Sequence, residues 1–163
     1  MEHQAPTIFV ALEQSGFAAA IRQSVWLYPT ANIGHILALF CFAGAIVVMD
    51  LRLIGTFPAT DPAELIARAR TFAAAALCGL AATGFLLFSA EASHVATNAV
   101  FQIKMLLVAA GLANIAVFQF VASRQLIGVP RGAPMPQAAR IAGYSSLVIW
   151  FAVAACGRAI AYF

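Results

Sequence analysis

The sequence predicts an all-α integral membrane protein: a four-helix up-and-down bundle with an N-terminal amphipathic helix at the membrane interface. Hydrophobic residues make up 63% of the 163 residues and charged residues only 9%, whereas about a quarter of a soluble domain is charged. Four apolar stretches approach the roughly 20 residues that a helix needs to cross a bilayer. None of them contains proline, which suits continuous helices. They are residues 33–49, 72–88, 100–122 and 141–163.

The segment before the first span, residues 6–24, is too polar to cross a membrane. Its apolar residues alternate with polar ones, and Pro6 stands where a helix can begin. This pattern is typical of a helix that lies in the interface plane. Trp26 and Tyr28 are of the types that settle at headgroup depth, and Pro29 is expected to break the chain before the span. The apolar residues of the segment are Ile8, Phe9, Leu12, Phe17 and Ile21.

The remaining elements follow in chain order within a single domain, residues 1–163. Thr60, Asp61 and Pro62 form the start of a helix, so the second helix is expected to begin near Pro62 and to extend beyond the lipid. Residues 128–136 hold three prolines and predict a loop. Short links make consecutive helices run up and down. The predicted spans cover about 31–50, 71–90, 99–122 and 141–162.

Basic residues are distributed unevenly between the two sides of the membrane. The first and third links carry six arginines, whereas the opposite side has Arg22, Lys104 and Arg158. Cytoplasmic loops carry an excess of Lys and Arg, so both links are expected in the cytoplasm. Both termini and residues 89–98 would then face the periplasm of a bacterial inner membrane. A cleavable signal peptide is not expected, since no Lys or Arg precedes Arg22. The six arginines are Arg52, Arg68, Arg70, Arg124, Arg131 and Arg140.

Three ionisable residues are expected at one depth, one to two turns inside the outer surface: His35, Lys104 and Arg158. Such residues normally face the bundle and mark function. Snorkelling to the surface is an alternative for Lys104 and Arg158, because their side chains are long. The imidazole of His35 is too short for that. It is therefore either a hydrogen-bonded core histidine or a ligand of a metal or haem.

A b-type haem is the cofactor that this arrangement suits. His35 and His94 would be the axial ligands, and Lys104 and Arg158 would pair with the propionates. If the third helix continues back to Ser93, however, His94 lies about 15 Å above Lys104. A bend in the chain would then be needed to bring His94 level with His35.

Other polar residues predict less. Asp50 and Arg52 suggest a helix-end ion pair or a contact with a neighbouring helix, and Thr83 can bond the backbone of its own helix. The sequence contains no Gly-rich phosphate loop, Ser/His/Asp constellation or His-Glu-x-x-His motif, so it gives no support to hydrolase or nucleotide chemistry. The net charge of +3 reflects the loops rather than a nucleic-acid partner.

Three function classes are compatible with these patterns. The leading hypothesis is a membrane anchor or small subunit for electron transfer, with haem b near the outer surface. The second is an accessory or structural subunit that packs against other membrane subunits or its own copies and binds only lipid. The third is an oligomeric transporter of small solutes or ions, because four helices alone form a narrow pore at best.

Several motifs resemble a family of small bacterial four-helix inner-membrane proteins of unknown function. The resemblance covers nearly the whole chain and implies the four-helix membrane fold, with emphasis on His35, Asp50, Arg52 and Lys104. His94 departs from the pattern, which has an aromatic residue there. Gln119 likewise replaces a frequent histidine. The matching motifs are Trp26-Leu27-Tyr28-Pro29, Gly34-His35-Ile36-Leu37, Asp50-Leu51-Arg52-Leu53-Ile54-Gly55, Asn98, Phe101, Lys104 and Asn114.

Overall fold

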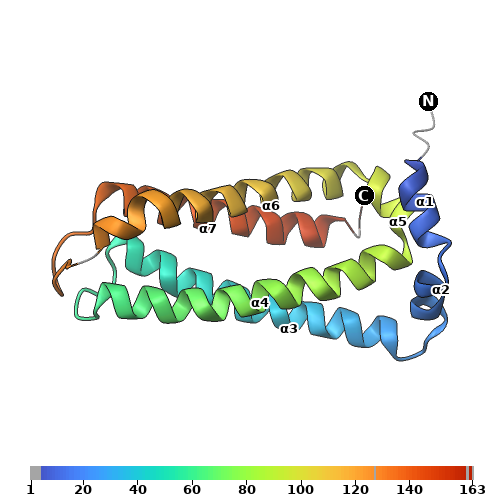
Figure 1. The fold of residues 1–163 in the computed structure, drawn as a ribbon, viewed down its shortest axis with the longest axis horizontal. Helices are drawn as coiled ribbons and strands as arrows, with labels where there is room; N and C mark the ends of the chain where they lie inside the picture. Colours follow the sequence, from blue (N-terminus) through green and yellow to red (C-terminus); the bar gives the residue numbers. More distant parts are fainter. Residues whose placement is uncertain (1–4, 127, 161, 163) are drawn as a thin grey trace.

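The computed structural model describes residues 5–126, 128–160 and 162, and over these residues the protein is an all-α bundle (Figure 1). Its four long helices are each long and apolar enough to cross a membrane. The predicted fold class, a four-helix membrane bundle, is thereby confirmed. These helices are α3 (Leu27–Ile54), α4 (Pro62–Ala90), α6 (Ala99–Val117) and α7 (Gln137–Ala159).

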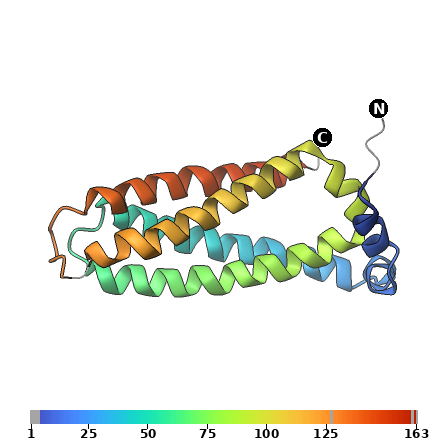
Figure 2. The same ribbon diagram turned by 45° about the horizontal axis from the view of Figure 1, so that its top comes forward.

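The bundle has two ends that differ in structure. One end, here called the loop end, holds the connections 55–61 and 128–136. The other, here called the cap end, holds three short helices that lie across the ends of the long ones (Figures 1 and 2). These are α1 (Thr7–Glu13), α2 (Gly16–Gln23) and α5 (Ala92–Thr97).

The long helices pack as two antiparallel pairs, α3 with α4 and α6 with α7, and the pairs join mainly where α3 meets α7. Among the described residues α4 packs little on α6 along its length. Side chains link these two helices near both ends: the Arg70 guanidinium donates to Gln119 Oε1 at 2.5 Å, and the Phe88 and Phe101 rings stack with centroids 5.4 Å apart. Side-chain contacts therefore hold α4 to α6 and its continuation mainly near the two ends of these helices.

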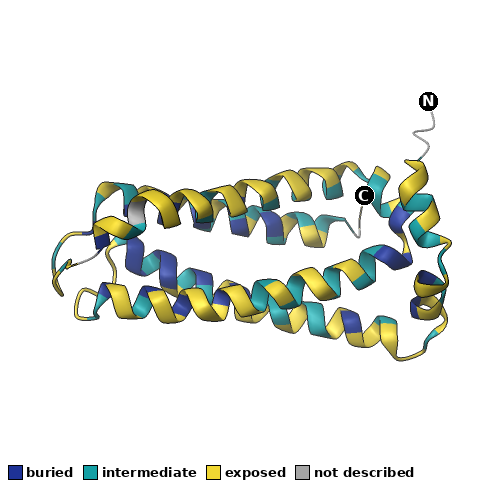
Figure 3. Cartoon of the chain, viewed as in Figure 1, coloured by how far each residue is buried: buried dark blue, intermediate teal, exposed yellow. Residues whose placement is uncertain are grey.

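Buried side chains concentrate in the half of the bundle nearer the loop end (Figure 3). There α3, α4 and α7 enclose a continuous apolar core. Gly143 lets α7 approach α3 so closely that a Cβ at this position would lie 3.0 Å from the Asp50 carbonyl oxygen. The largest contributors to the core include Phe42, Ile46, Leu53, Ile66, Phe118 and Trp150.

Helices α3, α4 and α7 begin before the starts of the predicted spans, whereas α6 begins at Ala99 and α7 ends at Ala159, within them. Helix α3 begins at Leu27, so Pro29 lies inside its first turn instead of breaking the chain before it. A proline is tolerated there because the first-turn N–H groups have no partner within the helix. Helix α4 begins at Pro62 as predicted, and Asp61 caps it by accepting from the Glu64 N–H at 3.0 Å. Helix α6 continues as a π-helix, Phe118–Ala122.

The N-terminal amphipathic segment forms two helices, where the sequence predicted one. The break falls at Gln14 and Ser15, and the Ser15 hydroxyl both donates to the Leu12 carbonyl and accepts from the Ala18 N–H. The break lets α1 pack on α5 while α2 packs on α4. The contacts of α1 and α2 with different helices therefore outweigh the apolar stripe that predicted one continuous helix.

A polar contact fastens α1 to α5. The Glu13 carboxylate accepts from the Ser93 backbone N–H at 2.7 Å and from the Ser93 hydroxyl. These two hydrogen bonds, with smaller contributions from the charges of Arg22 and His94, hold the pKa of the Glu13 carboxyl below its ordinary value of 4.5. Arg22 links α2 to α4, because its guanidinium donates a hydrogen bond to the Ala90 carbonyl at 2.9 Å.

Candidate functional site

His35 lies half-buried on α3 and faces α4. Its Nδ1 is 2.9 Å from the Thr83 hydroxyl oxygen, and a Cβ at Gly84 would come 3.2 Å from its Cε1. Thr83 and Gly84 thus form the wall against which the imidazole rests. The ring is held in one position by a polar contact and by close packing.

The hydrogen bonds around Thr83 assign the tautomer of neutral His35. The Thr83 hydroxyl donates its single proton to the Gly79 carbonyl at 2.6 Å, so its oxygen acts as an acceptor toward His35. The His35 Nδ1 must then carry the proton and donate. The Nε2 atom, for which the described residues provide no hydrogen-bond partner, keeps its lone pair. A histidine held through one nitrogen with the other free is the usual arrangement of a metal or haem ligand.

Lys104 lies near this histidine. Its ammonium group, on α6, packs against Gly157 of α7, where a Cβ would be 3.9 Å from Nζ. Its positive charge acts on the His35 imidazole across the bundle, and none of the described contacts joins the two side chains.

Arg158 is placed differently. Its side chain is exposed on the last turn of α7, where the guanidinium donates to the Tyr162 hydroxyl and lies 4.4 Å from the centroid of the Tyr162 ring. The group is thus held by its own helix end and remains available at the surface.

His94 lies on α5, exposed, where its charge acts on Glu13 of α1. Helix α6 does not continue back to Ser93, because the Asn98 side chain caps it by accepting from the Val100 and Phe101 N–H groups at 2.9 and 3.1 Å. The chain therefore changes direction at Asn98, between α5 and α6. None of the described contacts joins the His94 ring to His35.

A second group of polar side chains lies in the core near the loop end. Asp50 is 0% exposed, Arg52 1% and Ser146 3%. Asp50 and Arg52 form no ion pair with one another: the Arg52 guanidinium turns to the 55–61 connection and donates to the Thr60 carbonyl at 3.1 Å, whereas Asp50 faces Ser146 of α7. Of the two interpretations drawn from the sequence, the contact with a neighbouring helix is the one observed for Asp50.

Sequence reasoning missed the partners of both polar groups. The Thr83 bond to its own helix was expected and is confirmed, but its contact with His35 depends on the pairing of α3 with α4. Ser146 and Trp150 looked like ordinary residues of an apolar helix. A turn-by-turn spacing of Gly143, Ser146 and Trp150 along one face of α7 was the signal available.

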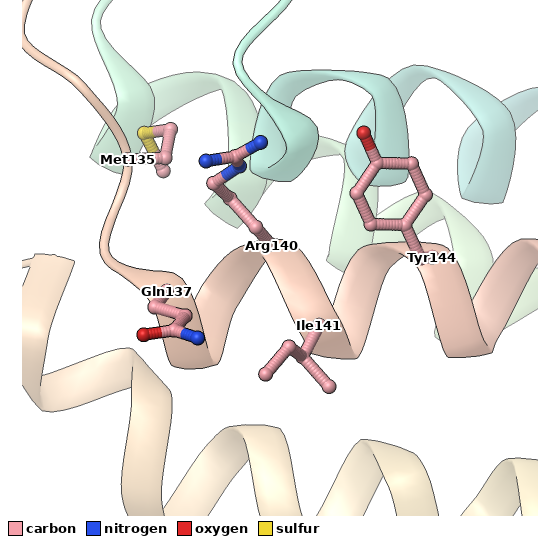
Figure 4. A pocket seen from close by; sticks show the side chains of 5 residues that line it. All are labelled: Met135, Gln137, Arg140, Ile141 and Tyr144. Atoms are coloured by element: carbon pink, nitrogen blue, oxygen red, sulfur yellow. The ribbon is translucent and has the colours of Figure 1, made fainter.

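A surface depression of about 330 Å³ lies at the start of α7 (Figure 4). Arg140 and Tyr144 project from the same side of the helix there, and both are exposed. No group of three or more His, Cys, Asp or Glu side chains that could hold a metal ion is found among the described residues. The His35 region, where Thr83 and Gly84 hold the imidazole, is the candidate site. The depression is lined by Met135, Gln137, Arg140, Ile141 and Tyr144.

Comparison with curated proteins and with solved structures gave no match. A family model does match, over residues 10–163, which is nearly the whole chain. The protein is therefore a multi-pass membrane protein that belongs to DUF6644, a family of unknown function, as the resemblance predicted.

Proposed function

We propose that this protein is a membrane subunit for electron transfer that binds a b-type haem through His35. The observation that carries the proposal is the hydrogen bond from His35 Nδ1–H to Thr83 Oγ1, because it leaves Nε2 free and fixes the ring. Iron ligation through one imidazole nitrogen, with the other donating to a protein oxygen, is the common arrangement in haem and metal sites.

The surroundings of His35 supply the other needs of a haem. The macrocycle requires apolar contacts, and its propionates require cations. Lys104 is the cation close to His35. Arg158 lies exposed near the cap end of α7 and is the second candidate for a propionate. Haem chemistry at this position would carry one electron at a time near the cap end of the bundle.

The test is an absorption spectrum of the detergent-purified protein, expressed with haem supplied. We expect a Soret band that His35→Ala reduces at least tenfold per mole of protein, while the variant still inserts in the membrane. His3→Ala is the control, because His3 is the histidine that is not among the proposed ligands. A Soret band of equal height in the H35A and wild-type proteins would overturn the assignment of His35.

The same spectra define the second axial ligand. Sharp α and β bands on reduction require two strong ligands on the iron. Loss of these bands in H94A, with the Soret band retained, would assign His94 as the second ligand. Unchanged bands would show that His94 has no part in the site.

A second candidate function rests on a different surface. Much of α4 is exposed, and the exposed face carries small residues that permit close approach of another helix. This face is what an accessory subunit would present to a larger complex or to its own copies. A colourless wild-type protein would favour this function over haem binding. The exposed residues on α4 include Phe72, Ala74, Ala75, Cys78, Ala81, Ala82 and Phe85.

For orientation we propose that the loop end faces the cytoplasm of a bacterial inner membrane. Exposed arginines gather there, including Arg68, Arg70 and Arg140, and basic residues are retained on the cytoplasmic side. A reporter active only in the cytoplasm is then expected to be silent when fused to the C-terminus and active when inserted in the 128–136 connection. Activity of the C-terminal fusion alone would reverse the orientation.

A further inference from the structure

The core near the loop end contains polar atoms that the haem proposal does not use. Both Asp50 carboxyl oxygens, the Ser146 hydroxyl, the Trp150 indole nitrogen and the Arg52 Nε are buried and have no hydrogen-bond partner in the described part of the chain. All belong to α3 and α7, which meet closely at Gly143. Buried polar atoms without partners are uncommon in folded proteins, and several on one pair of helices indicate a built site.

A negative charge on Asp50 would have no compensation in this position. The side chain is fully buried, and an ionised carboxylate removed from water costs several kcal/mol unless it is paired. The Ser146 hydroxyl is the polar group that reaches it. The Arg52 guanidinium, two residues along α3, is directed to the Thr60 carbonyl instead.

Charged side chains on the packed elements do not supply the missing charge either. On α4, Glu64 and Arg68 are exposed and form an ion pair of 2.7 Å, while Arg70 is bonded to Gln119. On α7, Arg140 is exposed at the surface depression. The part of α7 that faces Asp50 is therefore uncharged, and its polar group is the Ser146 hydroxyl.

The atoms around Asp50 are suited to a proton and not to a metal ion. Hard cations take about six oxygen ligands, and Ser146 supplies one. The other unpaired groups of α3 and α7, the Trp150 N–H and the Arg52 Nε–H, are donors and cannot act as oxygen ligands of a metal ion.

We infer that Asp50 is an intramembrane proton-binding site: its carboxyl carries a proton at neutral pH, and the Ser146 hydroxyl is the polar group of α7 that faces it. On binding, a proton from water adds to a carboxylate oxygen and the group becomes neutral; on release, the proton returns to water. Asp50 stands four residues from the end of α3, about 6 Å along the axis. The proton therefore has a short route to the loop end.

Infrared spectroscopy of the protein in lipid nanodiscs tests this inference. The chain holds two aspartates, Asp50 and Asp61. We expect wild-type protein at pH 7 to show the C=O band of a protonated carboxyl, and Asp50→Asn to lack it. Glu64→Gln removes an exposed carboxyl instead and should leave the band unchanged. Ser146→Ala should move the band to higher frequency, because the acid loses the polar group of α7 that faces it.

A labelled protein keeps the test valid if D50N fails to fold. Asp61→Asn preserves the helix cap, since asparagine caps as well as aspartate, and leaves Asp50 as the single aspartate. Growth with carboxyl-¹³C aspartate should then shift the band in this variant. A labelled carboxylate signal at pH 7 with no protonated band would overturn the inference. A band present without Na⁺ but abolished by Na⁺ at constant pH would overturn it in favour of a cation site.

Discussion

Replacing Gly143 with leucine is expected to detach α7 from α3. A Cβ at this position would lie 3.0 Å from the Asp50 carbonyl oxygen and 3.1 Å from the Leu53 Cβ. The first of these atoms belongs to the backbone, which cannot rotate away as a side chain can. Overpacking of this kind typically costs about 1–3 kcal/mol. The free energy of unfolding, measured by denaturant titration in mixed micelles, should fall by that amount.

Gly44→Leu provides the matched control for this substitution. Gly44 is also in the interior of a long helix, but it is exposed, and a Cβ there meets no atom within 4 Å. Leucine at this position should face lipid and change stability by less than about 0.5 kcal/mol. Equal stabilities of the two leucine variants would contradict the close approach of α3 and α7.

Replacing Trp150 with alanine should have an effect of similar or greater size. The indole packs edge-on against Phe42 of α3 with ring centroids 4.7 Å apart, and its other side lies against Gly111 of α6. Because lipid is about as apolar as the indole, moving the indole between lipid and core contributes little to stability. The folded bundle is destabilised instead by the lost van der Waals contacts and by the cavity left behind. Trp→Ala changes in well-packed cores cost about 3–5 kcal/mol, which is the expected fall in the free energy of unfolding.

Trp26→Ala is the control, because Trp26 is 79% exposed near the cap end. It should change the unfolding free energy by less than a third of the W150A effect. A second check uses Gly111, where a Cβ would come 2.7 Å from Trp150 Cζ2. Gly111→Ala should destabilise the wild type but not the W150A variant. An equal G111A effect in both backgrounds would show that Trp150 and Gly111 are not in contact.

The long helices were predictable because the cost of leaving backbone groups unpaired in lipid makes an apolar run helical in almost any context. Their ends were predictable only in part. The start of α4 at Pro62 could be predicted from the Asp61 cap, whereas Pro29 was expected to break the chain before α3 and instead lies in its first turn. Hydropathy marks the thickness of the lipid, whereas caps and packing set the length of a helix.

The candidate site shows the same limit. His35 and Lys104 could be selected from their depth in the sequence, and the charge of Lys104 acts on His35. Thr83 could not be assigned to His35, because the rotation of α4 about its axis depends on contacts spread over its whole length. The expected ion pair between Asp50 and Arg52 is the opposite case. Residues two apart lie about 200° around a helix, so the spacing itself argued against that contact.

The opposite directions of Asp50 and Arg52 fix the rotational register of α3. One side chain is directed to α7 and the other to the 55–61 connection. Turning the helix about its axis, or sliding it by a residue, would carry one of these groups toward the acyl chains, which is costly for a charged or strongly polar side chain. Any rearrangement of the bundle that keeps both contacts must therefore leave this end of α3 in place.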